Sequence, residues 1–333
     1  MKITLLMYRS LSNVFIELCL IGYPVAAKEE NKLWYEIHNT TLHIADEERL
    51  AKSAIGVLEI VRIAAEAKAG FDKDTEKQLK TAAAGLSSVS PEDVRPAWRE
   101  FISCAEKRAA LEILDSLGGV RSLLAEVAAM RGVEQPPQWH PEGDVWVHTM
   151  LCMDYIGEAD EITSTATLLH DVGKPPTFQV LDRIRFNKHE AVGGRIAVKV
   201  ALRLGYSESE AKDIEWIVRS HMKFKHIREM RPGRLKNLVI DGRFEKLAVV
   251  VRADCLASHG DTSDIDFAVT ARAEALKGLK MPRPLLRGRD LMEMGYSPGP
   301  HFGRALAELE EAQRQKKVKN KEEAKNFIKK FLG

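Results

Sequence analysis

The chain has little cysteine. Only four of its 333 residues are cysteine, and no two of them form a C-x-x-C pair: Cys19, Cys104, Cys152 and Cys255. A disulfide framework or a zinc site built on cysteine pairs needs closer, paired spacing. The cysteine content therefore implies neither zinc nor disulfides, and it suits a reducing compartment.

Long apolar runs are also missing. No apolar stretch reaches the roughly 20 residues that a membrane-spanning helix needs, so we expect no membrane association. Residues 1–27 loosely resemble a signal peptide, but Arg9 and Glu17 interrupt the apolar segment and make it a poor export signal. We therefore expect a cytoplasmic protein.

Neither sign of charge dominates the chain. The formal net charge of +2, from 50 basic and 48 acidic residues, indicates no partner by itself. Two stretches, 223–246 and 314–333, are locally basic, and such patches can contact phosphate. Solvated helix faces are the alternative; they are about equally favoured for the first stretch and preferred for the second.

Strand-like alternation is scarce, and the sequence predicts an all-α fold. From about residue 46, apolar residues recur at helical spacing, and glycine or proline separates the helices. One helix is expected to open near Asp46 and end at Gly70, and Ser90 with Pro91 is expected to cap and begin another.

The predicted helices fall into four parts. Gln135-Pro136-Pro137 forms a rigid connector and a plausible domain edge. We expect an N-terminal extension (1–45) whose structure the sequence does not indicate, and a helical neck-like domain (46–134). A helical domain that carries the site (135–280) and a C-terminal helical tail (281–333) follow.

The most informative feature is His170 followed by Asp171, placed between an apolar run and Gly-Lys-Pro-Pro. Imidazole and carboxylate together suit a divalent metal that keeps positions open for water and phosphate. Candidate ligands follow the order H…HD…H…H…D: His148, His170, Asp171, His189, His221 and Asp254. Asp254 lies on the apolar stripe of a helix predicted over 244–258, where a carboxylate is costly unless it is paired or bound to metal.

This order of residues resembles that of the HD metal-dependent phosphohydrolases. The resemblance implies that Asp171 anchors one metal or bridges two, and that His148, His170 and Asp254 complete the first metal's shell. The alternative for these four residues is ordinary capping or packing.

The number of metals stays open. In six-ligand members of the superfamily, histidines placed like His189 and His221 hold a second metal, and in single-metal members such positions can line the phosphate pocket. Helix-terminal contacts are a further alternative for both. The implied cofactor is one or two divalent ions, with Mg, Mn, Ni, Fe and Co as candidates.

Two further residues are expected to meet the substrate. Lys174 could neutralise a phosphate oxygen in the transition state, which makes it a catalytic candidate beside Asp171; satisfying a helix C-terminus is the alternative. His140 is the first residue of the segment 140–176, which contains His148, His170 and Asp171, and it is predicted, with Lys174, to bind substrate. The other histidines are predicted to be surface residues: His38, His43, His226, His259 and His301.

A narrower resemblance covers most of the chain. Residues 130–190 look like the HD portion of the bacterial tRNA nucleotidyltransferase/poly(A) polymerase family, through MRGVEQPPQWHPEGDVWVHT, LLHDVGKPPT and FNKHEAVGG. Residues 283–313 are similar to that family's helical tail, and 58–117 to a diverged copy of its neck. The family's transferase head carries a glycine-rich strand-turn and an Asp-x-Asp/Glu pair. Residues 1–45 are too short for that head and contain neither motif, and the D-x-D of residues 72–74 lies in the neck-like segment.

The expected function is metal-dependent hydrolysis of a phosphoester. By resemblance, the substrate is a nucleotide, a 2′,3′-cyclic nucleotide or an RNA-end phosphate, and tRNA or another RNA is the implied partner. A non-catalytic RNA-binding or partner protein is the alternative, and a nucleotidyltransferase with its head on a separate chain is a third. Nucleotidyl transfer by this chain alone is not expected, and the sequence does not indicate an oligomeric state.

Overall fold

The computed structural model describes residues 28–29, 32–33, 35–38, 40–44, 54–277, 284–314 and 317–332. The chain divides into two compact units, Met1–Ala271 and Arg272–Gly333. The predicted boundaries at residues 45 and 280 lie outside the described residues. The prediction of an all-α fold is confirmed, because helices make up most of the described chain and the strands are short.

The first unit contains most of the helices. In chain order they are α3 (Gly56–Glu66), α4 (Lys73–Ala84), the 3₁₀ helix η1 (Gly85–Ser88), α5 (Pro91–Ile102), α6 (Lys107–Ser116), α7 (Gly119–Leu123), α8 (Ala125–Ala128), α9 (Val145–Tyr155), α10 (Glu161–Leu169), α11 (Lys174–Thr177), α12 (His189–Arg203), α13 (Glu208–Ser220), the 3₁₀ helix η2 (His221–Glu229), α14 (Pro232–Val239), α15 (Phe244–Ala257) and α16 (Ser263–Lys277). The division between the two units falls within α16.

Local capping explains where several of these helices begin. Ser90 accepts a hydrogen bond from the backbone N–H of Asp93, and Pro91 is the first residue of α5, as predicted. Asp72 accepts hydrogen bonds from Asp74 and Thr75 and so caps α4. The D-x-D spelling is therefore part of a helix start, in agreement with its exclusion from the candidate site.

The expected helix end at Gly70 is wrong. Helix α3 ends at Glu66, because Gly70–Phe71 forms strand β5 and pairs in parallel with β4 (Thr41–Ile44). Helix α12 is preceded by Lys188, in a left-handed conformation with φ of 62°. Strand pairing and turn geometry of this kind are not encoded by helical periodicity.

The strands form small local sheets. β4 also pairs antiparallel with β3 (Tyr35–His38), and this sheet buries Tyr35, Ile37 and Leu42. β1 (Lys28–Glu29) pairs with β2 (Lys32–Leu33), and β6 (Phe178–Val180) forms a hairpin with β7 (Ile184–Phe186). The β6–β7 hairpin leads from α11 to the start of α12, which carries His189.

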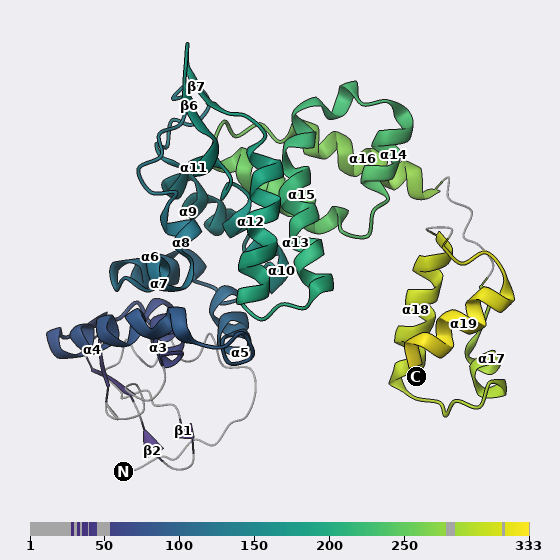
Figure 1. Cartoon of the computed structure of the whole chain (residues 1–333), viewed down its shortest axis with the longest axis horizontal. Coiled ribbons are helices and arrows are strands. Elements are labelled where there is room, and N and C mark those ends of the chain that lie inside the picture. Colours follow the sequence, from purple (N-terminus) through teal and green to yellow (C-terminus); the bar gives the residue numbers. More distant parts are fainter. Residues whose placement is uncertain are drawn as a thin grey trace. The chain divides into compact units, whose positions relative to one another are not determined.

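Helices α9, α10, α12, α13 and α15 gather around one region of the first unit (Figure 1). α12 packs along α13, α15 packs on α9, and α10 contacts α9, α12, α13 and α15. This arrangement brings the ends of α10 and α13 and the start of α12 to the same place.

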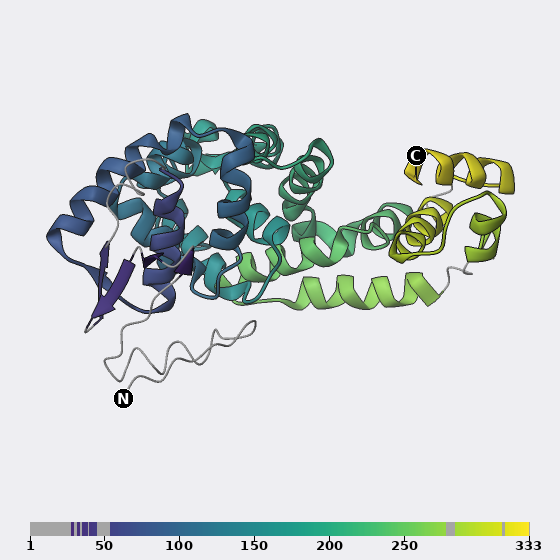
Figure 2. The same ribbon diagram turned by 90° about the horizontal axis from the view of Figure 1, so that it is seen from below.

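The second unit contains α17 (Gly288–Glu293), α18 (Pro300–Arg314) and α19 (Lys321–Leu332), drawn in yellow in Figure 2. It has a separate apolar core that includes Leu291, Ala305, Leu309 and Ile328. Over the part of the chain that the structure describes, none of the helices combines the length and apolarity needed to cross a membrane.

Candidate metal centre

Six predicted metal ligands come together from five helices. His148 lies within α9, His170 and Asp171 follow the last residue of α10, and His189 is the first residue of α12. His221 caps the C-terminal end of α13, and Asp254 lies in the last turn of α15. Because α10 stops at Leu169, His170 and Asp171 can both reach one point beyond its end, although adjacent helical residues point about 100° apart.

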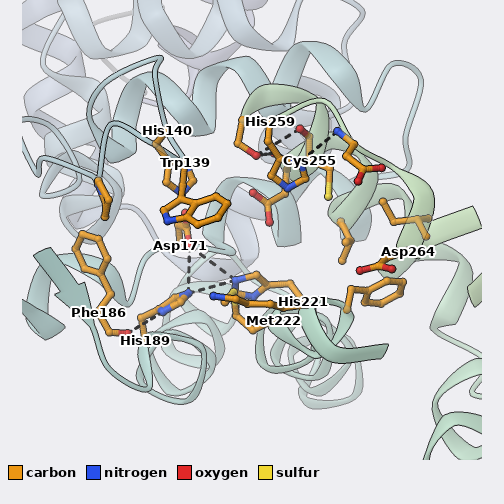
Figure 3. Close-up of a pocket in the computed structure, with 18 of the residues that line it drawn as sticks. Trp139, His140, Asp171, Phe186, His189, His221, Met222, Cys255, His259 and Asp264 are labelled. Carbon is orange, nitrogen blue, oxygen red and sulfur yellow. Dashed lines mark hydrogen bonds and ion pairs between the residues drawn. The ribbon is translucent and has the colours of Figure 1, made fainter. Parts of the chain in front are cut away.

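The Asp171 carboxylate is the centre of the cluster. Its Oδ2 lies 3.3 Å from His170 Nε2 and 3.9 Å from His148 Nε2. Its Oδ1 lies 3.5 Å from His189 Nε2 and 3.8 Å from His221 Nε2. Figure 3 shows the imidazoles of His189 and His221 turned toward this carboxylate. One carboxylate thus contacts two pairs of histidines, one pair through each oxygen.

The four histidines share one orientation. Three of them place Nδ1 against a backbone carbonyl, which can only accept: His170 against Thr167 O at 2.7 Å, His189 against Phe186 O at 3.0 Å and His221 against Val218 O at 2.6 Å. Nδ1 must therefore be the donor in each, so that in the neutral ring Nε2 carries a lone pair directed at the cluster.

The fourth histidine uses a carboxylate instead. His148 Nδ1 donates to Glu142 Oε1 at 2.6 Å, and His140 Nδ1 lies 2.9 Å from the same oxygen. A carboxylate or carbonyl on the far ring nitrogen is the usual support of a metal-binding histidine, because it fixes the ring and raises its basicity. Glu142 thus supports one predicted ligand and one predicted substrate residue.

The separations between the ligand atoms fit bound cations. Nitrogen and oxygen ligands about 2.1 Å from one ion lie about 3.0–3.4 Å apart in octahedral or tetrahedral geometry. His148 Nε2 lies 3.1 Å from Asp254 Oδ1, and His189 Nε2 lies 3.3 Å from His221 Nε2. Two imidazole lone pairs that face each other at this distance repel unless a proton or a cation lies between them.

One buried nitrogen at the centre makes no hydrogen bond. It is His170 Nε2, which lies 3.3 Å from Asp171 Oδ2, an oxygen that already pairs with the Lys174 ammonium. Buried polar atoms are normally satisfied, so this nitrogen is a reason to consider an ion. The residues present therefore fit a divalent metal, and the cluster could hold one.

The surroundings of Asp171 and His221 favour the protonation states that bind a cation. Burial opposes ionisation of Asp171, but the neighbouring ammonium of Lys174 and then His170 outweigh it and hold the pKa of this carboxyl well below its usual range. Burial and then the neighbouring His189 and His170 lower the pKa of His221 to about 3. A lowered pKa leaves His221 neutral at pH 7, which is the form that binds a metal.

Lys174 lies beside the predicted ligands. Its Nζ is 2.5 Å from Asp171 Oδ2 and donates to Gln135 Oε1 at 2.6 Å. Lys174 is the first residue of α11, and its ammonium contacts the side chains of Asp171 and Gln135. Lys174 is among the residues that line the adjoining cavity.

A cavity of about 450 Å³ opens beside the cluster. Its lining includes the predicted ligands Asp171, His189, His221 and Asp254 and the predicted substrate residues His140 and Lys174. Trp139, 60% exposed, and Phe186 add aromatic surface (Figure 3). The site therefore adjoins a space that can admit a small organic phosphate.

Sequence reasoning missed several residues of this region. Glu142 and Gln135 support His148 and Lys174, but they lie in an irregular segment without periodicity. His259 was predicted to be a surface residue, and it is exposed, yet it lines the cavity together with Asp261 and Asp264. The available signal was that Gln135 and Glu142 fall inside the segment resembling the HD portion of the family.

Comparisons with known proteins agree with these observations. Residues 144–258 match the family described as HD domain. The chain is 29% identical over 295 residues to the CC-adding tRNA nucleotidyltransferase of Thermus thermophilus, covering 85% of this chain and 67% of that protein. It is 31% identical over 290 residues to the Multifunctional CCA protein of Halorhodospira halophila, covering 80% and 66%.

Other relatives are covered less completely. The chain spans 58% of the Multifunctional CCA protein of Xanthomonas axonopodis, at 30% identity over 245 residues. A solved structure, a CCA-adding enzyme of Thermotoga maritima complexed with tRNA, aligns at a TM-score of 0.44 and 11% identity, over 88% of this chain and 64% of that one. The chain therefore contains an HD domain, and its homologues are CCA-adding and related tRNA nucleotidyltransferases.

Proposed function

We propose that the protein is a metal-dependent phosphohydrolase of the HD type. The observation that carries the proposal is the convergence of four imidazole Nε2 atoms on both oxygens of one buried carboxylate, Asp171. Bound divalent ions would supply a Lewis acid for the phosphoryl group and lower the pKa of water. In this proposal His148, His170, Asp171 and Asp254 hold one ion, and His189 and His221 hold a second with Asp171.

The remaining residues have separate roles in the proposal. Lys174 lines the cavity beside Asp171, and its ammonium would neutralise a phosphate oxygen as charge develops. Burial first, and then Lys174 and His148, lower the pKa of His140, so this side chain is neutral at pH 7 and can exchange hydrogen bonds with a substrate. The substrate class that we propose is a nucleotide, a 2′,3′-cyclic nucleotide or an RNA-end phosphoester, since exposed Trp139 offers a surface on which a base can stack.

The test is a phosphoester panel with single metals. Chelator-treated protein is reloaded with Mg²⁺, Mn²⁺, Ni²⁺, Co²⁺ or Fe²⁺ and assayed on a simple aryl phosphate, a 2′,3′-cyclic nucleotide and an RNA carrying a 3′-phosphate. We expect activity that requires metal and disappears in His170→Ala and Asp171→Ala while helical content is retained. Asp182→Ala is the matched control, because Asp182 is 66% exposed and pairs with Arg185 in the β6–β7 hairpin. Full turnover by folded Asp171→Ala protein with its metal unchanged would refute the assignment.

A second candidate is an RNA-binding protein without catalysis. It is favoured by the relatives, which are named for adding nucleotides to tRNA. A tRNA mobility-shift assay run beside the hydrolysis panel separates the two: binding that survives Asp171→Ala, without turnover in the wild type, would support the second candidate. Incubation with tRNA lacking its 3′ end and labelled nucleoside triphosphates is expected to give no extension by this chain alone.

A further inference from the structure

Cys152 lies inside the candidate metal centre and was assigned no role from the sequence. It follows His148 by four residues on α9, so the two side chains lie one above the other on the same helix face. Cys152 Sγ is 3.5 Å from His148 Nε2, and the thiol is fully buried. Cys152, His148 and His170 offer ligand atoms that all lie within 4.8 Å of one another.

The distance between sulfur and nitrogen matches two ligands of one ion. With sulfur about 2.3 Å and imidazole nitrogen about 2.1 Å from an ion, a tetrahedral angle separates them by about 3.6 Å. The observed separation is 3.5 Å. The 3.1 Å from the same Nε2 to Asp254 Oδ1 is likewise the edge of a ligand shell.

A cation explains this arrangement better than a hydrogen bond does. A thiol is a weak donor, and the carboxylate oxygen of Asp254, which lies 3.1 Å from the same Nε2, can only accept and is not satisfied by a neutral imidazole lone pair. One ion would satisfy the sulfur and the imidazole nitrogens of His148 and His170 together, and Asp254 Oδ1 lies beside the first of these nitrogens. The other buried cysteine, Cys104, is not part of any such group among the described residues, and neither is Cys255, which lines the cavity.

We propose that Cys152 is an additional ligand of the subsite formed by His148, His170, Asp171 and Asp254, and that its sulfur makes this subsite prefer Zn²⁺, Co²⁺ or Fe²⁺ over Mg²⁺. The inference rests on the proposed function. On binding, the S–H bond breaks, the sulfur donates its electron pair to the ion, and the proton passes to solvent. Soft thiolate ligands favour such ions, whereas a site of carboxylate and water alone suits Mg²⁺ or Mn²⁺. Cysteine thus contributes to metal binding here without a C-x-x-C pair.

The test uses Co²⁺ as a spectroscopic probe of the full chain. Chelator-treated protein is titrated with Co²⁺ and followed by absorption. Visible d–d bands report binding of the ion by any ligands, and a near-ultraviolet charge-transfer band reports a cobalt–sulfur bond. We expect both in the wild type, and we expect Cys152→Ser to lose the charge-transfer band while keeping the visible bands. Cys255→Ser and Cys104→Ser are the matched controls and should keep both.

Affinity gives a second readout. Zn²⁺ affinity relative to Mn²⁺ should fall at least about 10-fold in Cys152→Ser, since loss of even an outer partner of a metal ligand costs about 10–100-fold. Cys152→Ala, checked by circular dichroism, covers the case in which serine disturbs packing or binds the ion itself. Two outcomes would overturn the role of Cys152 and leave the metal centre standing. In the first, the visible bands appear without a charge-transfer band that depends on cysteine; in the second, only Cys255→Ser removes that band. Absence of visible bands and of bound cobalt would instead refute the metal centre of the proposed function.

Discussion

Gly173 offers the most direct test of how the candidate site is held together. It lies two residues after Asp171, and its backbone conformation, φ −83° and ψ −10°, suits any residue. A Cβ at this position would lie 2.1 Å from the carbonyl oxygen of His189 and 2.6 Å from the backbone nitrogen of Gly193. The glycine is therefore required by the close approach of two backbones.

The expected effect of Gly173→Ala follows from these distances. Carbon and carbonyl oxygen rarely approach closer than about 3.3 Å, so the start of α12 must move away from the turn after Asp171 by about 1 Å. His189 moves with it, and its Nε2 lies 3.5 Å from Asp171 Oδ1. Overpacking of this kind costs about 1–3 kcal/mol in stability, and a 1 Å misplacement can lower a rate about 10²-fold.

Three measurements on one preparation test this reasoning: urea unfolding, metal content and hydrolysis under the conditions proposed above. Gly233→Ala is the matched control, because Gly233 lies in α14 with open space around it and a helical φ. That change should be neutral or stabilise by about 0.4–1 kcal/mol. If Gly173→Ala unfolds at the wild-type midpoint and binds the wild-type amount of metal, the backbones separate freely and the contact has no positioning role.

Three further predictions concern the ligands, the ammonium and the scaffold. His189→Ala should lower the metal content measured by elemental analysis from about two ions per chain towards one if His189 is a ligand; a constant single ion would make it a pocket residue. Lys174→Ala should lower the catalytic rate by about 10²–10³ with little change in metal content, the loss expected for one stabiliser of a developing oxyanion; an unchanged kcat would leave Lys174 the structural role of pairing with Asp171. Arg95→Met should destabilise the protein by about 2–4 kcal/mol at pH 7, because the bidentate pair of Arg95 (13% exposed) with Glu161 (17% exposed) is largely buried. Arg95 is the main cause that lowers the pKa of Glu161 below 4.5. The difference in unfolding free energy between wild type and Arg95→Met should therefore persist above pH 4.5 and shrink as the pH falls through the lowered pKa. Urea unfolding at several pH values checks this, and an equal loss of stability at all pH values would exclude the ion pair as its source.

Much of the helical framework could be predicted from the sequence. Asp144 accepts from the backbone N–H of Val147 at the start of α9, and Ser207 forms a capping box with Glu210 at the start of α13. Such signals are local, because a side chain three residues away completes them. The first sets the start of α9, which carries His148, and the second sets the start of α13, at whose opposite end His221 lies.

The rest of the site depends on contacts between distant segments. Gln135 reaches Lys174 across 39 residues of sequence, whereas Glu142 reaches His148 over six, from a segment without periodicity. Cys152 shares a helix face with His148, but only the arrival of His170 from α10 makes that face part of a ligand group. Periodicity identifies a helix face, whereas the neighbours of that face are decided by packing.

The close contacts of the glycines in α12 could not be predicted from the sequence either. In the sequence, Gly193 and Gly194 form only a short pair without the pattern of a phosphate loop. In the structure Gly193 lies against the backbone of Gly173, and a Cβ on Gly194 would lie 2.4 Å from Arg219 Cγ, on α13. These glycines therefore let α12 approach the turn after Asp171 on one side and α13 on the other.

The position of each ligand explains why the motif and the packing are both needed. Four of the ligands lie at or just beyond helix ends: His170, Asp171, His189 and His221. A shift of one helix along its axis would therefore displace its ligand atoms, relative to the others, by the same amount. Ligand atoms of one ion must stay within a few tenths of an ångström of their places. The spelling H…HD…H…H…D specifies which atoms are available, and the backbone contact at Gly173 specifies how far apart they lie. A sequence that kept the histidines and aspartates but carried a larger residue at position 173 would therefore retain the motif and lose the geometry that we propose to bind metal.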